Sequence, residues 1–267
     1  MRVSVVQHDI AWEDPAATQL RLVPLIEQAA AAGSRLVVLT EMYATGFSMD
    51  TDRIAEPPGG PNEEFCVAQA TRHGVWLAAS VAQWRVAQWQ VAPLPVAGSP
   101  GRGRPRNVGL LAAPDGTVHR YAKIHPFSFG GEDRHYEAGD VTLTVDVEGV
   151  RVSLLICYDL RFADTFWGLA HGTDCYVVVA NWPQPRREHW RTLLAARAIE
   201  NQAYVVGANR VGMAPNGLAY SGDSRIVDPL GAVLAEASQV ETVLTAEVDP
   251  DRVAQVRREL PFLADRT

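Results

Sequence analysis

The chain has 267 residues, of which 47% are apolar and 21% are charged, a composition typical of soluble globular proteins with a sizeable core. Its formal net charge of -7 gives no sign of the basic surface that binds nucleic acid or anionic membranes. No apolar run approaches the roughly 18 residues that span a bilayer, and residues 1–6 enter a strand pattern without a secretory signal. We therefore expect a cytoplasmic protein with a small-molecule partner, no nucleic-acid partner and no membrane partner.

Apolar patterns predict strands along the whole chain, with helical patterns between them. In chain order the expected strands are 3–7, 36–40, 76–81, 108–112, 117–122, 141–147, 150–156, 175–180, 204–208, 224–227 and 243–247. The expected helices are 15–32, 62–73, 162–171 and 189–201. Such alternation favours an α/β protein with helices packed on its sheets. Because no linker composition or repeat divides the chain, we expect a single domain over residues 1–267.

One segment, 91–107, differs from the rest of the chain. It is rich in Pro, Gly and Ala and carries Arg102, Arg104 and Arg106. We interpret it as a solvated hairpin extension, with a functional lid as the alternative. The sequence leaves its role open.

Reactive side chains follow three of the expected strands. Glu41 comes directly after strand 36–40, Lys123 after strand 117–122, and Cys157 after strand 150–156. If these strands share a sheet or packed sheets, a carboxylate, an amine and a thiol converge at their ends.

These three groups are the ones that amide hydrolysis requires. A nucleophile must attack the carbonyl carbon, a base must take its proton, and donors must stabilise the oxyanion. We assign these roles to Cys157, Glu41 and Lys123 in that order, with the backbone N–H of Tyr158 as a second oxyanion donor. A thiol is mostly protonated at neutral pH, so a neighbouring carboxylate is needed to accept its proton.

The other cysteines and the histidines predict no metal site or disulfide framework. The chain has three cysteines, and Cys66 and Cys175 lie in a helical and a strand pattern, where a cysteine behaves as a small hydrophobe. The side chains weighed as a metal site are His119, His125, His135, Asp133 and Glu137. Their spacing fits no compact ligand pattern, so we expect no metal and no cofactor.

Three segments of this chain resemble the catalytic motifs of the nitrilase superfamily of carbon–nitrogen hydrolases. They are residues 40–47 (TEMYATGF), 121–125 (YAKIH) and 155–162 (LICYDLRF), and their order and spacing also match. The resemblance implies an α/β fold, a four-layer α-β-β-α sandwich with two mixed sheets. It also implies a homodimer or larger homo-oligomer, because members of the superfamily commonly pair through their helices.

The resemblance further implies a second glutamate that holds the catalytic lysine. Residues 130–140 (GGEDRHYEAGD) match this part of the family, and the second glutamate falls on Glu132. Glu137 then matches the carboxylate of the family's Glu-Pro-Gly-Asp turn, with Ala138 in place of proline. Glu137 is the alternative to Glu132 as the fourth catalytic member.

Within the superfamily, three further segments are similar to the bacterial omega-amidase branch: 181–186 (NWPQPR), 189–190 (HW) and 197–202 (RAIENQ). The resemblance implies hydrolysis of the terminal amide of a short dicarboxylic monoamide such as 2-oxoglutaramate or 2-oxosuccinamate, with release of ammonia. The remote carboxylate of such a substrate needs a cation or several donors. Arg186 and Arg187 are the candidates.

The walls of the pocket are expected to be aromatic. Phe127, Tyr158 and Trp182 each follow a motif at a strand end, and we assign them to the substrate pocket. Pro126 replaces the usual leucine of the lysine motif and stiffens this loop, which leaves substrate size open. Two other functions stay open as well: hydrolysis of a nitrile or an N-carbamoyl amine by the same residues, and a catalytically silent binding or scaffold protein.

Overall fold

The computed structural model describes residues 1–84 and 103–266, so most of the 91–107 segment lies outside the described residues. The strands are β1 (Arg2–Gln7), β2 (Leu36–Val38), β3 (Trp76–Gln83), β4 (Arg106–Ala112), β5 (Val118–Ala122), β6 (Thr144–Val147), β7 (Val150–Ile156), β8 (Cys175–Ala180), β9 (Tyr204–Asn209), β10 (Val211–Met213), β11 (Ala219–Val227), β12 (Val233–Ser238) and β13 (Thr242–Glu247). The α-helices are α1 (Pro15–Ala31), α2 (Thr51–Ile54), α3 (Pro61–His73), α4 (Glu132–His135), α5 (Ala163–Leu169), α6 (Arg187–Asn201) and α7 (Pro250–Glu259).

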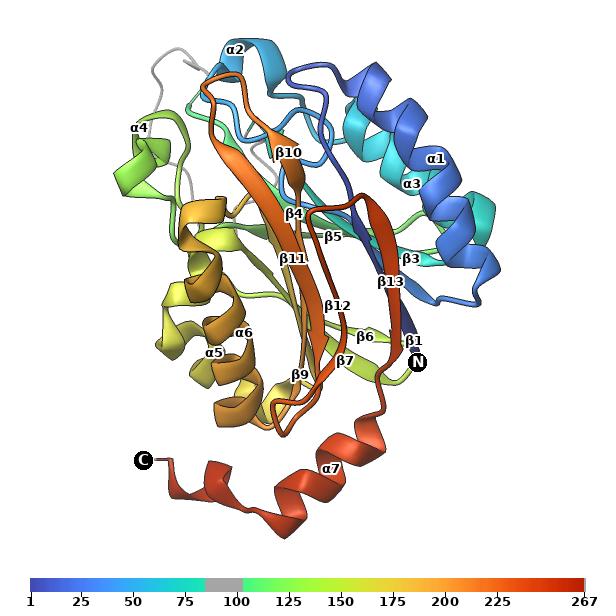
Figure 1. Cartoon of the computed structure of the whole chain (residues 1–267), viewed down its shortest axis with the longest axis vertical. Helices are drawn as coiled ribbons and strands as arrows, with labels where there is room; N and C mark the ends of the chain where they lie inside the picture. Colours follow the sequence, from blue (N-terminus) through green and yellow to red (C-terminus); the bar gives the residue numbers. More distant parts are fainter. Residues whose placement is uncertain (85–102, 267) are drawn as a thin grey trace, which may run out of the picture.

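The strands form two mixed sheets that pack face to face. One sheet has the order β13-β1-β2-β3-β4-β5, and the other has the order β10-β11-β9-β8-β7-β6, with β12 paired to β11. In each sheet three central strands are parallel and the outer pairings are antiparallel. Helices α1 and α3 cover the first sheet and α5 and α6 cover the second (Figure 1). The expected α-β-β-α sandwich is therefore confirmed.

The side chains along β2 alternate between two apolar layers, one between the sheets and one under the helices. Leu36 and Val38 point into the apolar layer between the sheets, whereas Val37 and Leu39 point toward the helices and meet Leu22 of α1. Successive side chains of a strand face opposite sides of its sheet, so an unbroken apolar run is needed when both faces are covered. This is why the sequence shows runs rather than apolar-polar alternation at these strands.

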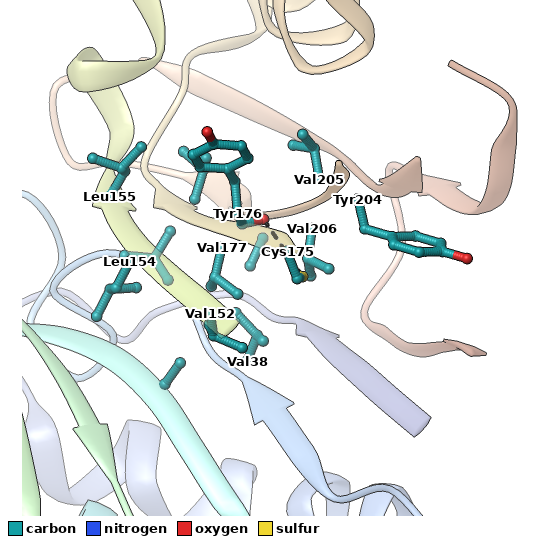
Figure 2. Packing of buried hydrophobic residues seen from close by; sticks show 14 of the residues in the cluster. Val38, Val152, Leu154, Leu155, Cys175, Tyr176, Val177, Tyr204, Val205 and Val206 are labelled. Carbon is teal, nitrogen blue, oxygen red and sulfur yellow. Dashed lines mark hydrogen bonds between the residues drawn. The ribbon is translucent and has the colours of Figure 1, made fainter. Parts of the chain in front are cut away.

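The layer between the sheets is built from small branched side chains. Figure 2 shows Val38 of β2 among Val152 and Leu154 of β7 and Val177 of β8. The fit is close at Gly109 of β4, where an added Cβ would lie 2.8 Å from Leu154 Cδ2. The sheets consequently have a fixed separation at the strand ends that carry the reactive side chains.

Some elements differ from the sequence expectation. Strand β6 begins at Thr144 rather than at residue 141, and α5 ends at Leu169, where a 3₁₀ turn takes over. The sequence patterns gave no sign of β10, β12 or α7. In β12 the side chains are exposed or half-buried, and α7 buries only Val253 and Val256, so neither carries a strong apolar period. Among the described residues, none of the helices combines the length and apolar character needed to cross a membrane.

The separation of the sheets predicts a specific stability effect. Leu154→Ala should lower the free energy of unfolding by about 2–5 kcal/mol, because the side chain is 1% exposed and its removal leaves a cavity between the sheets. The matched control is Leu20→Ala in α1, where Leu20 is 77% exposed and the change should stay within about 0.5 kcal/mol. Urea unfolding curves of both variants check this, and equal losses would contradict the packing described here.

Candidate active site

The structure brings the three expected strand-end residues together. Glu41 follows β2, Lys123 follows β5, and Cys157 follows β7 on the opposite sheet. The Lys123 Nζ atom lies 2.9 Å from Glu41 Oε1, and both side chains are fully buried. Cys157 is half-buried and shares a cavity wall with Glu41.

A second carboxylate completes the environment of the lysine. Glu132 begins α4, and its Oε2 atom lies 2.8 Å from Lys123 Nζ and accepts the backbone N–H of Phe127 at 2.5 Å. Glu137, the alternative, lies beside Arg106 at 3.8 Å, and its backbone N–H donates to a loop carbonyl. The structure thus places Glu132, and not Glu137, next to the lysine.

The lysine is held as an ammonium ion. Burial alone opposes a charge on Lys123, but the carboxylates of Glu132 and Glu41 outweigh it and raise its pKa well above the usual value. For Glu132 burial dominates and raises the pKa, although Lys123 opposes the shift. Removal of one partner from a buried ion pair typically costs ~3–5 kcal/mol, so the three charges depend on one another.

Cys157 has a backbone conformation that few residues other than glycine adopt. Its φ of 47° lies in the left-handed region and turns the chain sharply from β7 into a 3₁₀ helix. Burial, followed by the negative charge of Glu41, raises the pKa of the thiol well above its usual value, and Lys123 offsets only part of this. The thiol is therefore protonated at neutral pH and needs a base to become a nucleophile.

Asp159 joins the lysine loop to the cysteine loop. Its carboxylate accepts the Tyr121 hydroxyl at 2.8 Å, the Ile156 N–H at 3.0 Å, and both the backbone N–H and Nδ1 of His125 at 3.0 and 2.9 Å. The His125 ring also stacks on Phe162 with a centroid distance of 3.7 Å. This one buried acid therefore fixes the two loops relative to each other.

Two asparagines hold the carboxylates, and sequence reasoning missed both. Asn181, which follows β8, donates its backbone N–H to Glu41 Oε2 at 2.8 Å and its Nδ2 to the Glu41 carbonyl at 2.6 Å. Asn107 in β4 donates from Nδ2 to Glu41 and Glu132. Asn181 could have been found by its place after a strand, as Glu41 was, whereas Asn107 fell at the end of the 91–107 segment, just before the expected strand 108–112, and gave no such signal.

A cavity of about 300 Å³ opens above Cys157. Phe127, Tyr158, Trp182 and Arg186, the four expected pocket residues, all line it. The full lining is Trp12, Glu41, Phe47, Met49, Phe127, Gly130, Cys157, Tyr158, Arg161, Asn181, Trp182, Pro183, Arg186, Ala214, Asn216, Leu218 and Tyr220. The wall is thus mainly aromatic and apolar, with the carboxylate of Glu41 and a few polar groups facing the space.

Two arginines of this cavity have no anionic partner. Arg161 lies 4.6 Å from the ring of Trp182, and Arg186 lies 5.5 Å from the ring of Phe127. Within residues 1–84 and 103–266, neither guanidinium forms an ion pair. Burial lowers the pKa of Arg161 from its usual value, and the nearby charge of Arg186 also lowers it. The sequence reasoning missed Arg161, although it lies in the cysteine motif.

Arg187, weighed beside Arg186, has a different role. Its guanidinium pairs with the buried Asp223 at 2.5 Å, and it does not line the cavity. Of the histidines weighed for a metal, His119 stacks on Trp76 and His125 is bound to Asp159. In the described part of the chain, no group of three or more His, Cys, Asp or Glu side chains is arranged to hold a metal ion.

Comparison with known proteins gives the same assignment as the geometry. The family model described as carbon-nitrogen hydrolase matches residues 2–258. The chain belongs to the carbon-nitrogen hydrolase family. The expectation of an enzyme of this kind, an amidohydrolase of the nitrilase superfamily, is thereby confirmed.

Relatives of known name cover nearly the whole chain. The omega-amidase YafV of Escherichia coli (strain K12) is 35% identical over 99% of this chain and 96% of its own length. The 2-oxoglutaramate amidase of Bacillus subtilis (strain 168) is 31% identical over 98% of this chain and 96% of its own length. Among solved structures, XC1258 from Xanthomonas campestris, a CN-hydrolase superfamily protein, is 35% identical with a TM-score of 0.89 and covers 100% of this chain and 97% of its own.

The electrostatics of this carbon-nitrogen hydrolase predict when the thiol ionises. The thiolate absorbance of Cys157, measured as the ultraviolet difference from Cys157→Ser, should appear only at a pH well above neutral, because burial and Glu41 both raise the thiol pKa. In Glu41→Gln the negative charge is gone, so the thiolate should form at a lower pH than in the wild type. A thiolate already present at neutral pH in the wild type would contradict this description.

Proposed function

We propose that this protein hydrolyses the terminal amide of a small dicarboxylic monoamide, such as 2-oxoglutaramate or 2-oxosuccinamate, and releases ammonia. The observation that carries the proposal is the pair of guanidinium groups, Arg161 and Arg186, that form no ion pair with any described residue and line the cavity that contains Cys157. The similarity to proteins named omega-amidase and 2-oxoglutaramate amidase supports the same substrate class.

The arginine pair supports an anionic substrate for a physical reason. Two guanidinium groups that share a cavity repel each other, and here the charge of Arg186 lowers the pKa of Arg161. A carboxylate between them removes this repulsion and gains charge-assisted hydrogen bonds. Trp182 and Phe127 lie under the two guanidinium planes and limit their motion, so less conformational entropy is lost on binding.

Cavity size supports a short acyl chain. Ligand cavities usually measure roughly 300–1,000 Å³, and this one, at about 300 Å³, lies at the small end. Phe127, Tyr158 and Trp182 line it, and the Phe127 and Tyr158 rings lie 5.0 Å apart. These aromatic walls and the small volume favour a four- or five-carbon acid over a long chain.

In the first half-reaction, the thiol of Cys157 attacks the amide carbonyl carbon while Glu41 accepts the thiol proton. The oxyanion is stabilised by Lys123 and the backbone N–H of Tyr158. The carbon–nitrogen bond then breaks, Glu41 returns the proton to the nitrogen, and ammonia leaves from a thioester. The raised thiol pKa supports this order, because the proton transfers during attack and not before it.

In the second half-reaction, water replaces ammonia. Glu41 takes a proton from the water as its oxygen bonds to the thioester carbon, and the carbon–sulfur bond breaks. The proton returns to Cys157 and the dicarboxylate leaves. Glu132 keeps Lys123 charged and in place through both steps, which its 2.8 Å contact with Nζ supports.

The setting of the enzyme is also part of the proposal. We infer a cytoplasmic homodimer or larger homo-oligomer. Three free cysteines support a reducing compartment. Trp167 of α5 and Ile199 of α6 are 48% and 53% exposed, and such apolar residues on the outer helices support association through that layer.

A substrate panel tests the proposal directly. Ammonia release should be fastest with 2-oxoglutaramate and 2-oxosuccinamate, and much slower with an aliphatic nitrile, which lacks both the amide and the carboxylate, or an N-carbamoyl amino acid, which presents a ureido group in place of the amide. Cys157→Ser should release no ammonia from any of them while it keeps the wild-type melting temperature. If the nitrile or the carbamoyl compound were hydrolysed fastest, the proposed substrate class would be wrong.

The arginine pair predicts a separate effect on substrate binding. Arg161→Met and Arg186→Met should each raise KM for 2-oxoglutaramate by roughly ten- to a hundredfold, because each removes a charge-assisted contact worth ~1.5–3 kcal/mol. Hydrolysis of a monoamide without the second carboxylate should hardly change. The matched control is Arg191→Met, an exposed arginine of α6 that pairs with Glu188. If KM were equally affected in the control, the arginines would not bind the carboxylate.

A further inference from the structure

We propose that Asn107 is a positioning residue that fixes the carboxylates of Glu41 and Glu132 beside Lys123 and aims Glu41 at Cys157. The inference deepens the proposed function, because it names a residue on which the base of that reaction depends. It rests on one buried side-chain amide that touches both carboxylates.

The geometry around Asn107 uses both hydrogens of its amide. The Nδ2 atom lies 2.8 Å from Glu41 Oε1 and 3.1 Å from Glu132 Oε1. The side chain is 1% exposed, so water does not replace these bonds in the folded protein. Its backbone carbonyl accepts the N–H of Lys123 at 2.9 Å, so one residue of β4 contacts all three charged members.

The orientation of the amide follows from its neighbours. The backbone N–H of Met42 donates to Ser80 Oγ at 2.8 Å, so the hydroxyl hydrogen of Ser80 is free to donate to Asn107 Oδ1 at 2.9 Å. With Oδ1 used as an acceptor, Nδ2 must face the carboxylates. This line of bonds crosses β3 and β4 from the loop after Glu41, and it prevents the amide from flipping.

Asn107 fills one of the acceptor positions of the Glu41 carboxylate. A carboxylate has about four acceptor positions. Lys123 Nζ and Asn107 Nδ2 occupy two at Oε1, and the backbone N–H of Asn181 occupies one at Oε2. One position at Oε2 is left for the proton of Cys157. Rotation of the carboxylate would break bonds on both oxygens, so the base keeps a single orientation.

The contribution to Glu132 is different. Its Oε2 atom accepts from Lys123 and Phe127, whereas Asn107 is the donor that reaches Oε1 among the described residues. Hydrogen bonds to the charged form favour ionisation, and two nearby carboxylates otherwise favour a shared proton. By donating to Oε1, Asn107 favours the ionised form of Glu132 beside Lys123, against the burial that raises the pKa of Glu132.

The pH dependence of Cys157 alkylation by iodoacetamide tests the inference without any substrate. In Asn107→Ala and in Asn107→Asp the acidic limb of the alkylation rate should move to higher pH by about one unit or more, because Glu132, whose pKa burial already raises, loses its donor at Oε1. The shift should be larger in Asn107→Asp, which keeps the size of the side chain and adds a third carboxylate. For 2-oxoglutaramate, kcat should fall roughly a hundredfold at neutral pH, and the limb of its pH profile should move in the same direction.

Asn181→Ala is the matched control. It removes a side-chain amide that touches Glu41, but only at the carbonyl, and the backbone N–H that reaches Oε2 remains. Its activity can fall, yet its acidic limb should stay at the wild-type pH. A limb that moved equally in this control would show that any disturbance near Glu41 suffices, which would overturn the specific role of Asn107.

Three further outcomes are decisive. If the acidic limb of the alkylation rate stayed at the wild-type pH in both Asn107 variants, and alkylation were slowed equally at every pH, Asn107 would be a packing residue. That result would overturn the inference. Failure of both variants to fold would also overturn it, since Asn107 would then serve the fold. If the wild type did not hydrolyse 2-oxoglutaramate but the alkylation limb moved as expected, the proposed substrate would fail while the role of Asn107 stood.

Discussion

The site depends on one ammonium group buried between two carboxylates. Lys123 Nζ lies 2.9 Å from Glu41 and 2.8 Å from Glu132, and all three side chains are essentially without solvent. The lysine could not remain charged at this depth without the two carboxylates, which raise its pKa against the effect of burial. These three groups are held in contact by the strand ends and loops that carry them and by the two asparagines.

Much of this site could be predicted from the sequence because its reactive residues follow strands. Glu41, Lys123 and Cys157 each come directly after an apolar run, and the ends of packed strands meet in space. The pocket aromatics Phe127 and Trp182 were found for the same reason. The family resemblance also implied a second glutamate close to the lysine in sequence, either Glu132 or Glu137, and the structure places Glu132 beside the lysine.

Other parts could not be predicted because they depend on which strands are neighbours. Asn107 reaches Glu41 only because β4 lies between β3 and β5, an order that no local pattern carries. Arg186 and Arg187 are adjacent in sequence, yet one lines the cavity and the other pairs with Asp223 at the start of α6. β12 and α7 were missed because their side chains bury too little apolar surface to leave a period.

The parts of the site belong to different halves of the sandwich. Glu41 and Lys123 follow strands of one sheet, whereas Cys157 and Asn181 follow strands of the other. Neither half of the fold alone places this thiol beside a carboxylate. The two groups meet only when both sheets are packed, so the chemical reactivity of the sulfur also reports whether the halves of the sandwich have docked.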